Sequence, residues 1–319
     1  MTLFVRGQDA GIGTFNDLVG QALESAPTPK PEAEITAAGF TTTTAAIFNY
    51  QPGLEYDYRF NQQQTGDHFS TDINEAHFSF SLFHGPTKFL AEYFHVWSDA
   101  SNGVGLAKTS DADGIKISLT ETLFHYAPED TSKIGRDILF SFPFFLKQEN
   151  LDALTSSGRK ISDTGSFIIS PFVLFSASWP LDKADEKRYR NLTLSLSPGF
   201  RLIISDKDFT NVNLSNVRGW KGTFSLLPRV DYDITKTVSL NASFTWAHLT
   251  NYHSSDSAAP PDANVFSLAA GVVVKPRLRE KEEKESSARP LSLSLTYQYD
   301  GFNRDYYQHS ITLLATYKF

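Results

Sequence analysis

Apolar and polar residues alternate along most of the chain from about residue 53 onward. In the segment 54–61, leucine and aromatic residues at even positions alternate with charged or amide residues at odd positions. The last segment, 310–319, repeats this pattern with Leu314 as its one exception. A period of two is the signature of a β-strand with one apolar and one polar face. Twelve such segments predict an all-β protein, and they lie at 54–61, 78–82, 89–97, 115–120, 138–146, 167–179, 192–204, 224–233, 238–246, 266–274, 291–300 and 310–319.

The predicted strands are long for a soluble protein. They extend to roughly 10 to 16 residues, whereas strands of soluble domains usually have about five or six. A tilted strand needs about 9 to 11 residues to cross a bilayer. Aromatic residues stand near the ends of several segments, at Tyr126, Trp179, Trp220, Trp246 and Tyr299. We therefore predict an antiparallel transmembrane β-barrel of about 12 strands, with 14 as the other possible count.

Two kinds of connection alternate between the predicted strands. With twelve strands, both ends of the barrel lie on the same side of the membrane, and barrels of this kind have long loops on one side and short turns on the other. We expect the longer polar connections at 62–74, 99–113, 149–165, 206–218 and 252–263. The shorter or charge-rich ones are expected at 85–87, 127–135, 180–188, 235–236 and 279–288.

The composition agrees with a barrel and excludes other classes. The chain has 26 Phe, 13 Tyr and 4 Trp, yet its mean hydropathy is only −0.28. No apolar run reaches the roughly 18 residues of a transmembrane helix. Cysteine is absent, which suits a barrel in an oxidising compartment. The net charge of −7 gives no basic surface for nucleic acid.

The first 40 residues differ in kind from the rest. Thr14 and Asp17 have the spacing of a helix capping box, and three prolines follow between residues 27 and 31. We predict a leader at 1–40, with a helix at 14–25 and a Pro-rich linker at 26–34, before a barrel at 41–319. The leader could be disordered, could pack inside or under the barrel as a plug, or could bind a periplasmic or membrane partner. The helix would present one apolar face, made of Phe15, Leu18, Val19, Ala22 and Leu23.

No arrangement of residues with catalytic or metal-binding spacing emerges. His309 and Ser310 are adjacent, so they point to opposite faces of a strand. Asp231 and Asp233 share one face but are expected inside the barrel, near a short turn. We therefore expect no enzyme activity, no cofactor and no metal site. None of the eight histidines forms a metal-like pair: His68, His77, His84, His95, His125, His248, His253 and His309.

Charged residues on the polar face of the strands would line the barrel interior. Their signs are mixed, so we expect no strong ion selectivity. Two interpretations remain open: mutual ion pairing that rigidifies a closed barrel, and a hydrated, weakly selective pore. The candidate pore-lining residues are Glu55, Asp57, Arg59, Glu92, Lys116, Lys147, Arg201, Lys221, Arg229, Asp231, Asp233, Lys275 and Asp300.

The terminal sequence Tyr317-Lys318-Phe319, at the end of an alternating strand and after eleven similar strands, resembles that of Gram-negative outer-membrane β-barrels. The resemblance implies that Tyr317 and Phe319 belong to an assembly signal read by the barrel-assembly machinery. It also implies contact with outer-membrane lipid and lipopolysaccharide. Residues 1–6 do not look like a signal peptide, so we expect this to be the mature chain of a cell outer-membrane protein.

A helix followed by about 270 residues of twelve-stranded barrel also resembles an autotransporter translocator. In that family the helix threads the lumen and tethers a passenger, whereas here a Pro-rich linker follows the helix and no passenger is present. We expect a porin-like channel that passes small polar solutes passively. The alternatives are a translocator or anchor without a conducting pore, and a barrel enzyme acting on lipid or peptide.

Overall fold

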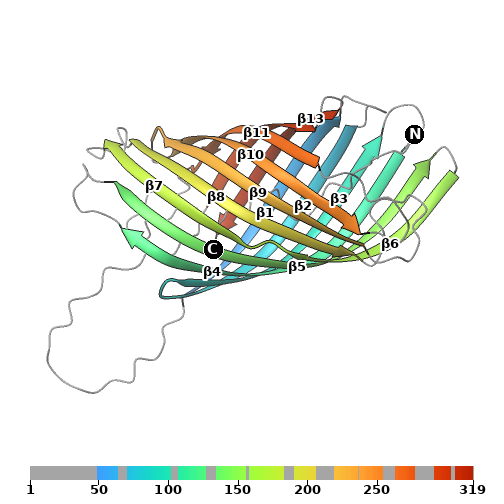
Figure 1. Ribbon diagram of the computed structural model, residues 1–319, viewed down its shortest axis with the longest axis horizontal. Helices are drawn as coiled ribbons and strands as arrows, with labels where there is room; N and C mark the ends of the chain where they lie inside the picture. Colours follow the sequence, from blue (N-terminus) through green and yellow to red (C-terminus); the bar gives the residue numbers. More distant parts are fainter. Residues whose placement is uncertain are drawn as a thin grey trace, which may run out of the picture.

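In the computed structural model the chain forms a closed antiparallel β-barrel whose strands run obliquely around it (Figure 1). This confirms the predicted fold class. The structure describes residues 49–63, 70–101, 107–126, 134–155, 158–182, 190–205, 219–235, 237–253, 263–276, 291–302 and 306–318. The predicted leader 1–40, its helix 14–25 and its linker 26–34 lie outside these residues, and so does Phe319.

The described residues form thirteen strand segments. Within this part of the chain, no helix is long and apolar enough to cross a membrane. The segments are β1 (Asn49–Gln63), β2 (Ser70–His84), β3 (Thr87–Ser101), β4 (Ala107–Tyr126), β5 (Gly135–Thr155), β6 (Gly158–Ile169), β7 (Phe172–Asp182), β8 (Arg190–Ser205), β9 (Gly219–Asp233), β10 (Val238–His253), β11 (Ala263–Val274), β12 (Leu291–Phe302) and β13 (Tyr306–Lys318).

Segments β6 and β7 together make one strand of the barrel wall. Both pair with β5 on one side and with β8 on the other. β6 pairs with residues 144–155 of β5 and 202–205 of β8, and β7 pairs with residues 135–141 of β5 and 190–199 of β8. Only Ser170 and Pro171 separate them, and proline cannot donate to a hydrogen-bond ladder. The ladder is bridged by the Ser170 N–H, which donates to the Pro143 carbonyl at 2.9 Å. The wall therefore has twelve strands, as the sequence predicted, and not fourteen.

The barrel closes where its first strand meets its last. β1 and β13 pair antiparallel from Gly53 opposite Lys318 to Gln63 opposite Gln308, and Leu54 stands opposite Tyr317. This confirms the expected pairing of the strand near Leu54 with the final strand. It also places the start of β1 and the end of β13 at the same mouth of the barrel.

The two faces of the wall differ in chemistry. On β5, Phe142 and Leu146 are 41% and 48% exposed, whereas Phe145 between them is 1% exposed. Similar large apolar side chains are exposed on the outer face of every wall strand, from Leu54 on β1 to Leu313 on β13. An apolar surface of this extent is suited to lipid and not to water. The alternating polar residues face the interior.

Two connections that the sequence predicted as long loops are largely strand. β4 and β5 have 20 and 21 residues, and they pair through most of the stretches 107–113 and 149–155. The prediction was wrong there because it required one apolar face. Outside the lipid both faces of a strand can be polar. The backbone hydrogen bonds between β4 and β5 therefore continue where apolar and polar residues no longer alternate.

The closing pair of strands gives a first testable prediction. Tyr317 stands opposite Leu54 on one side and Leu291 on the other, both at outward-facing positions. Tyr317→Asp places a carboxylate on this apolar seam, and we expect several-fold less folded protein in the membrane. Deletion of Phe319 should reduce assembly similarly if this residue is part of the signal. Heat-modifiable migration on gels measures folding. Tyr317→Phe is the control, and normal migration of both altered chains would refute the role of this end.

Candidate functional site: the barrel interior

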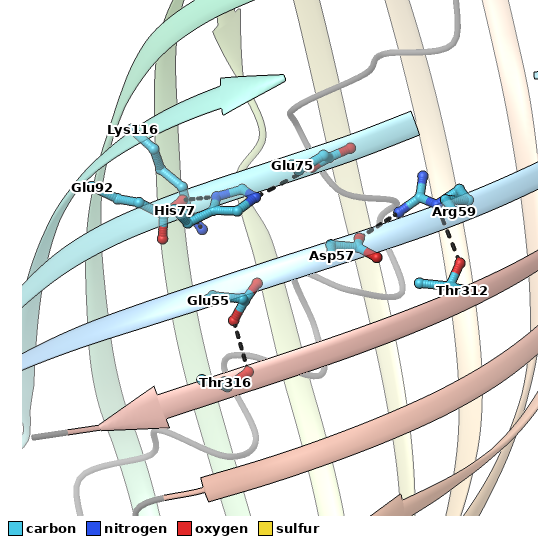
Figure 2. A network of polar contacts seen from close by, with 9 residues as sticks. All are labelled: Glu55, Asp57, Arg59, Glu75, His77, Glu92, Lys116, Thr312 and Thr316. Atoms are coloured by element: carbon cyan, nitrogen blue, oxygen red, sulfur yellow. Dashed lines mark hydrogen bonds and ion pairs between the residues drawn. The ribbon is translucent and has the colours of Figure 1, made fainter. Parts of the chain in front are cut away.

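A network of charged side chains crosses the interior from β1 to β4 and over the closing seam to β13 (Figure 2). It arises because interior-facing positions alternate along each strand, and neighbouring strands bring these positions side by side. Its members are Glu55, Asp57 and Arg59 on β1, Glu75 and His77 on β2, Glu92 on β3, Lys116 on β4, and Thr312 and Thr316 on β13.

His77 lies at the centre of the network between two carboxylates. Its Nδ1 is 3.1 Å from Glu92 Oε1 and its Nε2 is 3.3 Å from Glu75 Oε2. A neutral imidazole has only one N–H, so it could donate to only one of these oxygens. The geometry is satisfied when both ring nitrogens carry a proton, which makes His77 a buried cation.

The remaining charges in the network also contact opposite charges or hydroxyl groups. Lys116 Nζ is 3.5 Å from Glu92 Oε1. Arg59 donates to Asp57 Oδ2 at 3.3 Å and, across the seam, to Thr312 Oγ1 at 3.2 Å. With His77 charged, three cations face four carboxylates. A buried network of this kind is tolerated because its charges are almost fully compensated.

A second part of the interior is apolar, which the sequence reasoning missed. Eleven buried side chains, each at most 2% exposed, form one cluster that we call the apolar stripe. The signal was present in segments such as 138–146 and 172–175, where both faces of the strand are apolar. The stripe consists of Ile73, Phe94, Val96, Ala112, Leu139, Phe145, Ile168, Phe172, Leu174, Ile203 and Leu227.

The stripe and the charged network meet at β3 to β5. Lys116 Nζ lies 5.8 Å from the centre of the Phe145 ring, a cation–π distance. The Phe94 ring covers Gly114 on the next strand so closely that a Cβ there would be 2.1 Å from Phe94 Cζ. Gly114 is therefore required by packing at this position. The side chains on this side of the interior are closely packed and almost completely buried.

The third part of the interior, on β10 to β13, is lined mainly by small polar side chains. They are only half-buried, in contrast to the stripe, and they carry hydroxyl and amide groups. Gly271 lies among them, and a Cβ there would be 2.7 Å from Thr296 Oγ1 and 3.0 Å from Asn241 Oδ1. We call this surface the hydroxyl wall; it consists of Ser239, Asn241, Ser243, Thr245, Ser267, Ser292, Ser294, Thr296, Gln298 and Thr312.

The thirteen residues predicted to line a pore fall into three groups. Buried are Asp57, Arg59, Glu92, Lys116 and Lys147. Half-buried are Glu55, Arg201, Arg229, Asp231, Asp233, Lys275 and Asp300, while the side chain of Lys221 is not described. The network unites Glu55, Asp57, Arg59, Glu92 and Lys116. That these residues line a conducting pore stays a prediction.

The predicted residues outside the network have local partners. Arg229 binds Asp231 through two nitrogens at 2.7 to 3.0 Å. Lys147 contacts Glu149 at 3.1 Å, and Asp233 accepts from Ser239 at 2.7 Å. Asp300 accepts from Gln298 at 2.8 Å, and Arg201 donates to Ser170 at 3.4 Å. Arg229 and Lys147 thus lie beside carboxylates, whereas Asp233, Asp300 and Arg201 form hydrogen bonds with neutral side chains.

Sequence reasoning missed several interior residues that alternation could have revealed. Glu75, His77, Lys88 and Glu149 are interior, and Glu75, His77 and Lys88 are buried. Glu75 and His77 stand at odd positions of β2, as do Ser79 and Ser81, and the odd positions of this strand were predicted to form its polar face. They were overlooked because they precede the clearly alternating part of that strand.

Other histidines lie on the outer face beside aromatic residues. The His95 and Trp97 rings meet edge to face with centroids 4.1 Å apart. Asn264 Oδ1 lies 3.1 Å from His248 Nδ1 and accepts a hydrogen bond from Trp246 Nε1 at 3.2 Å. Such clusters are typical of the aromatic girdle at a membrane interface. Among the described residues, no group of three or more His, Cys, Asp or Glu is arranged to hold a metal ion.

Comparisons with known proteins identify the fold. No protein-family model matches the chain, and no curated protein matches it significantly. The translocator domain of autotransporter NalP from Neisseria meningitidis is similar, with a TM-score of 0.51, 12% identity and 84% of this chain and 88% of that one covered. The transport unit of autotransporter AIDA-I from Escherichia coli is similar with a TM-score of 0.52 and 10% identity, and the match covers 88% of this chain and 93% of that one. An outer membrane channel from Pseudomonas putida F1 is similar with a TM-score of 0.50 and 9% identity, and the match covers 84% of this chain and 95% of that one.

These likenesses and the architecture define the class. The closed twelve-strand barrel with an apolar outer face has the fold of Gram-negative outer-membrane β-barrels. At 9–12% identity the neighbours show the fold alone, and they include both translocators and a channel.

The charged network yields a prediction about stability. Glu92→Gln removes the carboxylate that His77 and Lys116 share, and it leaves two buried cations near each other. Breaking a buried ion pair costs about 3 to 5 kcal/mol, so we expect the free energy of unfolding to fall by about 3 kcal/mol.

Urea unfolding in lipid vesicles, followed by fluorescence of the four tryptophans, measures this change. The control is Asp111→Asn on the outer face, where the carboxylate is 56% exposed and contacts His95. An exposed pair contributes at most about 1 kcal/mol. Equal effects of the two substitutions would show that the network does not stabilise the barrel.

Proposed function

We propose that the protein is a passive, porin-like channel of the outer membrane that passes small polar solutes. The observation that supports this best is the hydroxyl wall, whose side chains are half-buried inside a closed barrel. Hydroxyl and amide groups can exchange hydrogen bonds with water and with solutes without binding either tightly. A twelve-strand barrel is wider than the eight-strand barrels that side chains fill.

The proposed path follows β10 to β13, because the charged side chains of the network and the apolar stripe occupy β1 to β9. The middle of the hydroxyl wall, around Ser243, Thr245 and Thr296, is uncharged. Charged residues near the path, such as Arg229 and Asp231, pair with each other. We therefore propose weak selectivity between cations and anions and discrimination mainly by size.

The orientation in the membrane follows from the ends of the strands. We propose that the mouth where β1 begins and β13 ends faces the periplasm. The other mouth, beyond which β4 and β5 extend, would then face outward. Contact with lipopolysaccharide, the barrel-assembly machinery as a partner, and the absence of an enzyme activity belong to this proposal.

A second candidate is an autotransporter-type translocator or anchor. It is favoured by the likeness to two translocator structures, which extends over most of each chain. A translocator would show no steady conductance as an isolated chain and would hold or export another segment.

Single-channel conductance of the full chain in a planar bilayer tests the channel. We expect stepwise currents with little preference for K⁺ or Cl⁻. Thr296→Trp puts a bulky ring on the hydroxyl wall and should reduce the unit conductance several-fold. Leu295→Trp, on the lipid-facing side of the same strand, is the matched control and should leave it unchanged. A silent full chain, or equal effects of both substitutions, would refute the proposed path.

A further inference from the structure

Prolines stand at neighbouring positions on four successive strands of the barrel wall. The Pro143 carbonyl on β5 accepts from the N–H of Ser170, the residue before Pro171, at 2.9 Å. Pro198 on β8 stands opposite Leu226 of β9, two residues from Pro228. These contacts place the prolines side by side across the wall. We call them the proline line; it consists of Pro143, Pro171, Pro198 and Pro228.

The proline line crosses the part of the wall that faces lipid. Phe142, Leu196 and Leu226 lie beside it, and their apolar side chains are exposed on the outer face. Proline has no N–H to donate, so it is rarely found within a sheet except at edges, strand starts and bulges. In lipid, backbone groups must find their partners within the protein. The wall therefore has fewer backbone hydrogen bonds along this line than elsewhere.

The pairing is weakest between β8 and the wall strand that β6 and β7 form together, although these elements run side by side (Figure 1). β6 pairs with β8 as far as Ile169. β7 pairs with β8 at Phe172, opposite Gly199, and then again only from Phe175 onward. Of residues 170–174, Phe172 alone therefore stands opposite a ladder partner in β8.

Pro198 causes the gap at residues 173 and 174. In an antiparallel pair the two opposed residues exchange both of their backbone hydrogen bonds, and proline cannot donate its half. The register places Val173 opposite Pro198. The Val173 carbonyl accepts a hydrogen bond from Ser197 Oγ at 2.9 Å instead. A side chain thus replaces the missing backbone donor at this point.

The gap at residues 170 and 171 is crossed by one backbone bond and one side-chain bond. The Phe200 N–H donates to the Pro171 carbonyl at 2.9 Å. Arg201 Nε donates to Ser170 Oγ at 3.4 Å. Because a side chain can rotate away without disturbing its own strand, these links part more easily than a continuous ladder.

The wall is apolar on both faces at these two gaps. Phe172, Leu174 and Ile203 belong to the apolar stripe on the inner face. Phe175 and Leu196 are exposed to lipid on the outer face. Separation of the two strands here would join an apolar part of the interior directly to the hydrocarbon of the bilayer.

The interface between β9 and β10 lacks this combination. Its pairing is interrupted once, between Arg229 and Leu226, where Pro228 and Leu227 stand. Thr245, opposite Leu227 in this register, brings a hydroxyl group to the inner face. This interface therefore serves as an internal comparison for the one beside β8.

We propose that residues 170–174 and residues 197–201 form a gate in the barrel wall, through which small apolar molecules pass between the interior and the lipid. We call it the side gate. It opens when the bonds of Ser197 to Val173 and of Arg201 to Ser170 part. A polar solute would lose its hydrogen bonds to water between two apolar surfaces, so the side gate selects apolar molecules. This route is separate from the hydroxyl wall and serves a different class of solute.

Replacement of single prolines tests the side gate with N-phenylnaphthylamine, an apolar probe that fluoresces in lipid and that lipopolysaccharide excludes from intact cells. We expect faster entry of the probe into cells with the full chain in their outer membrane than into cells without it. Pro198→Val supplies an N–H opposite Val173 and should slow this entry several-fold. Pro228→Val restores a donor between β9 and β10, as the matched control, and should leave the rate unchanged. Equal effects of both substitutions, or no entry through the unaltered protein, would overturn the proposal.

A reversible cross-link tests the same gate without relying on proline. The chain has no cysteine, and the register places Leu174 opposite Ser197. In Leu174→Cys with Ser197→Cys, oxidation should slow probe entry several-fold, and reduction should restore it. Ala242→Cys with Ala270→Cys, opposite each other in the uninterrupted pairing of β10 and β11, is the control. Probe entry that does not respond to oxidation of the gate pair would show that the prolines only shape the wall.

Heat-modifiable migration confirms in each case that the barrel has folded. Probe entry and ion conductance are separate readouts. Conductance without probe entry would refute the side gate and keep the proposed channel, whereas probe entry without conductance would do the opposite.

Discussion

The structure depends on one constraint: a polypeptide in lipid must satisfy its own backbone hydrogen bonds. A sheet meets this condition only if it has no edge, and here the pairing of β1 with β13 removes the last one. The interruption at Ser170 and Pro171 shows how strict the condition is. The ladder there is bridged by backbone hydrogen bonds to Pro143 and Pro171, and the wall continues as one strand.

Closure fixes which side chains meet inside the barrel. The seam brings Arg59 within hydrogen-bond distance of Thr312 and Glu55 within that of Thr316, although each pair is separated by more than 250 residues. The registers of β2 with β3 and of β3 with β4 place Glu92 between His77 and Lys116. The part of the charged network that joins β1 to β13 is therefore a consequence of closure. The network also stabilises the barrel from within, because its ion pairs join β2, β3 and β4 and its hydrogen bonds to Thr312 and Thr316 join β1 to β13.

The interior is divided among three chemistries, and this division shapes any function. The charged network and the apolar stripe share β2, β3 and β4, and there both are buried. The hydroxyl wall is uncharged over its middle and half-buried. The solute path that we propose follows the hydroxyl wall, because the middle of this surface carries no fixed charge.

The sequence alone determined the class of structure. Alternation with a period of two and the length of the segments predicted a twelve-strand barrel and the pairing of its ends, because side-chain parity and bilayer thickness act locally on each strand. It also assigned Asp57, Arg59 and Lys116 to the interior. It could not show that His77 lies between two carboxylates, or that Phe94 covers Gly114, because alternation within a strand does not give the register between neighbouring strands. The apolar stripe was missed because periodicity cannot distinguish lipid outside a barrel from a packed surface inside it. Only the tertiary structure showed which apolar face is on the outside of the barrel and which is packed inside it.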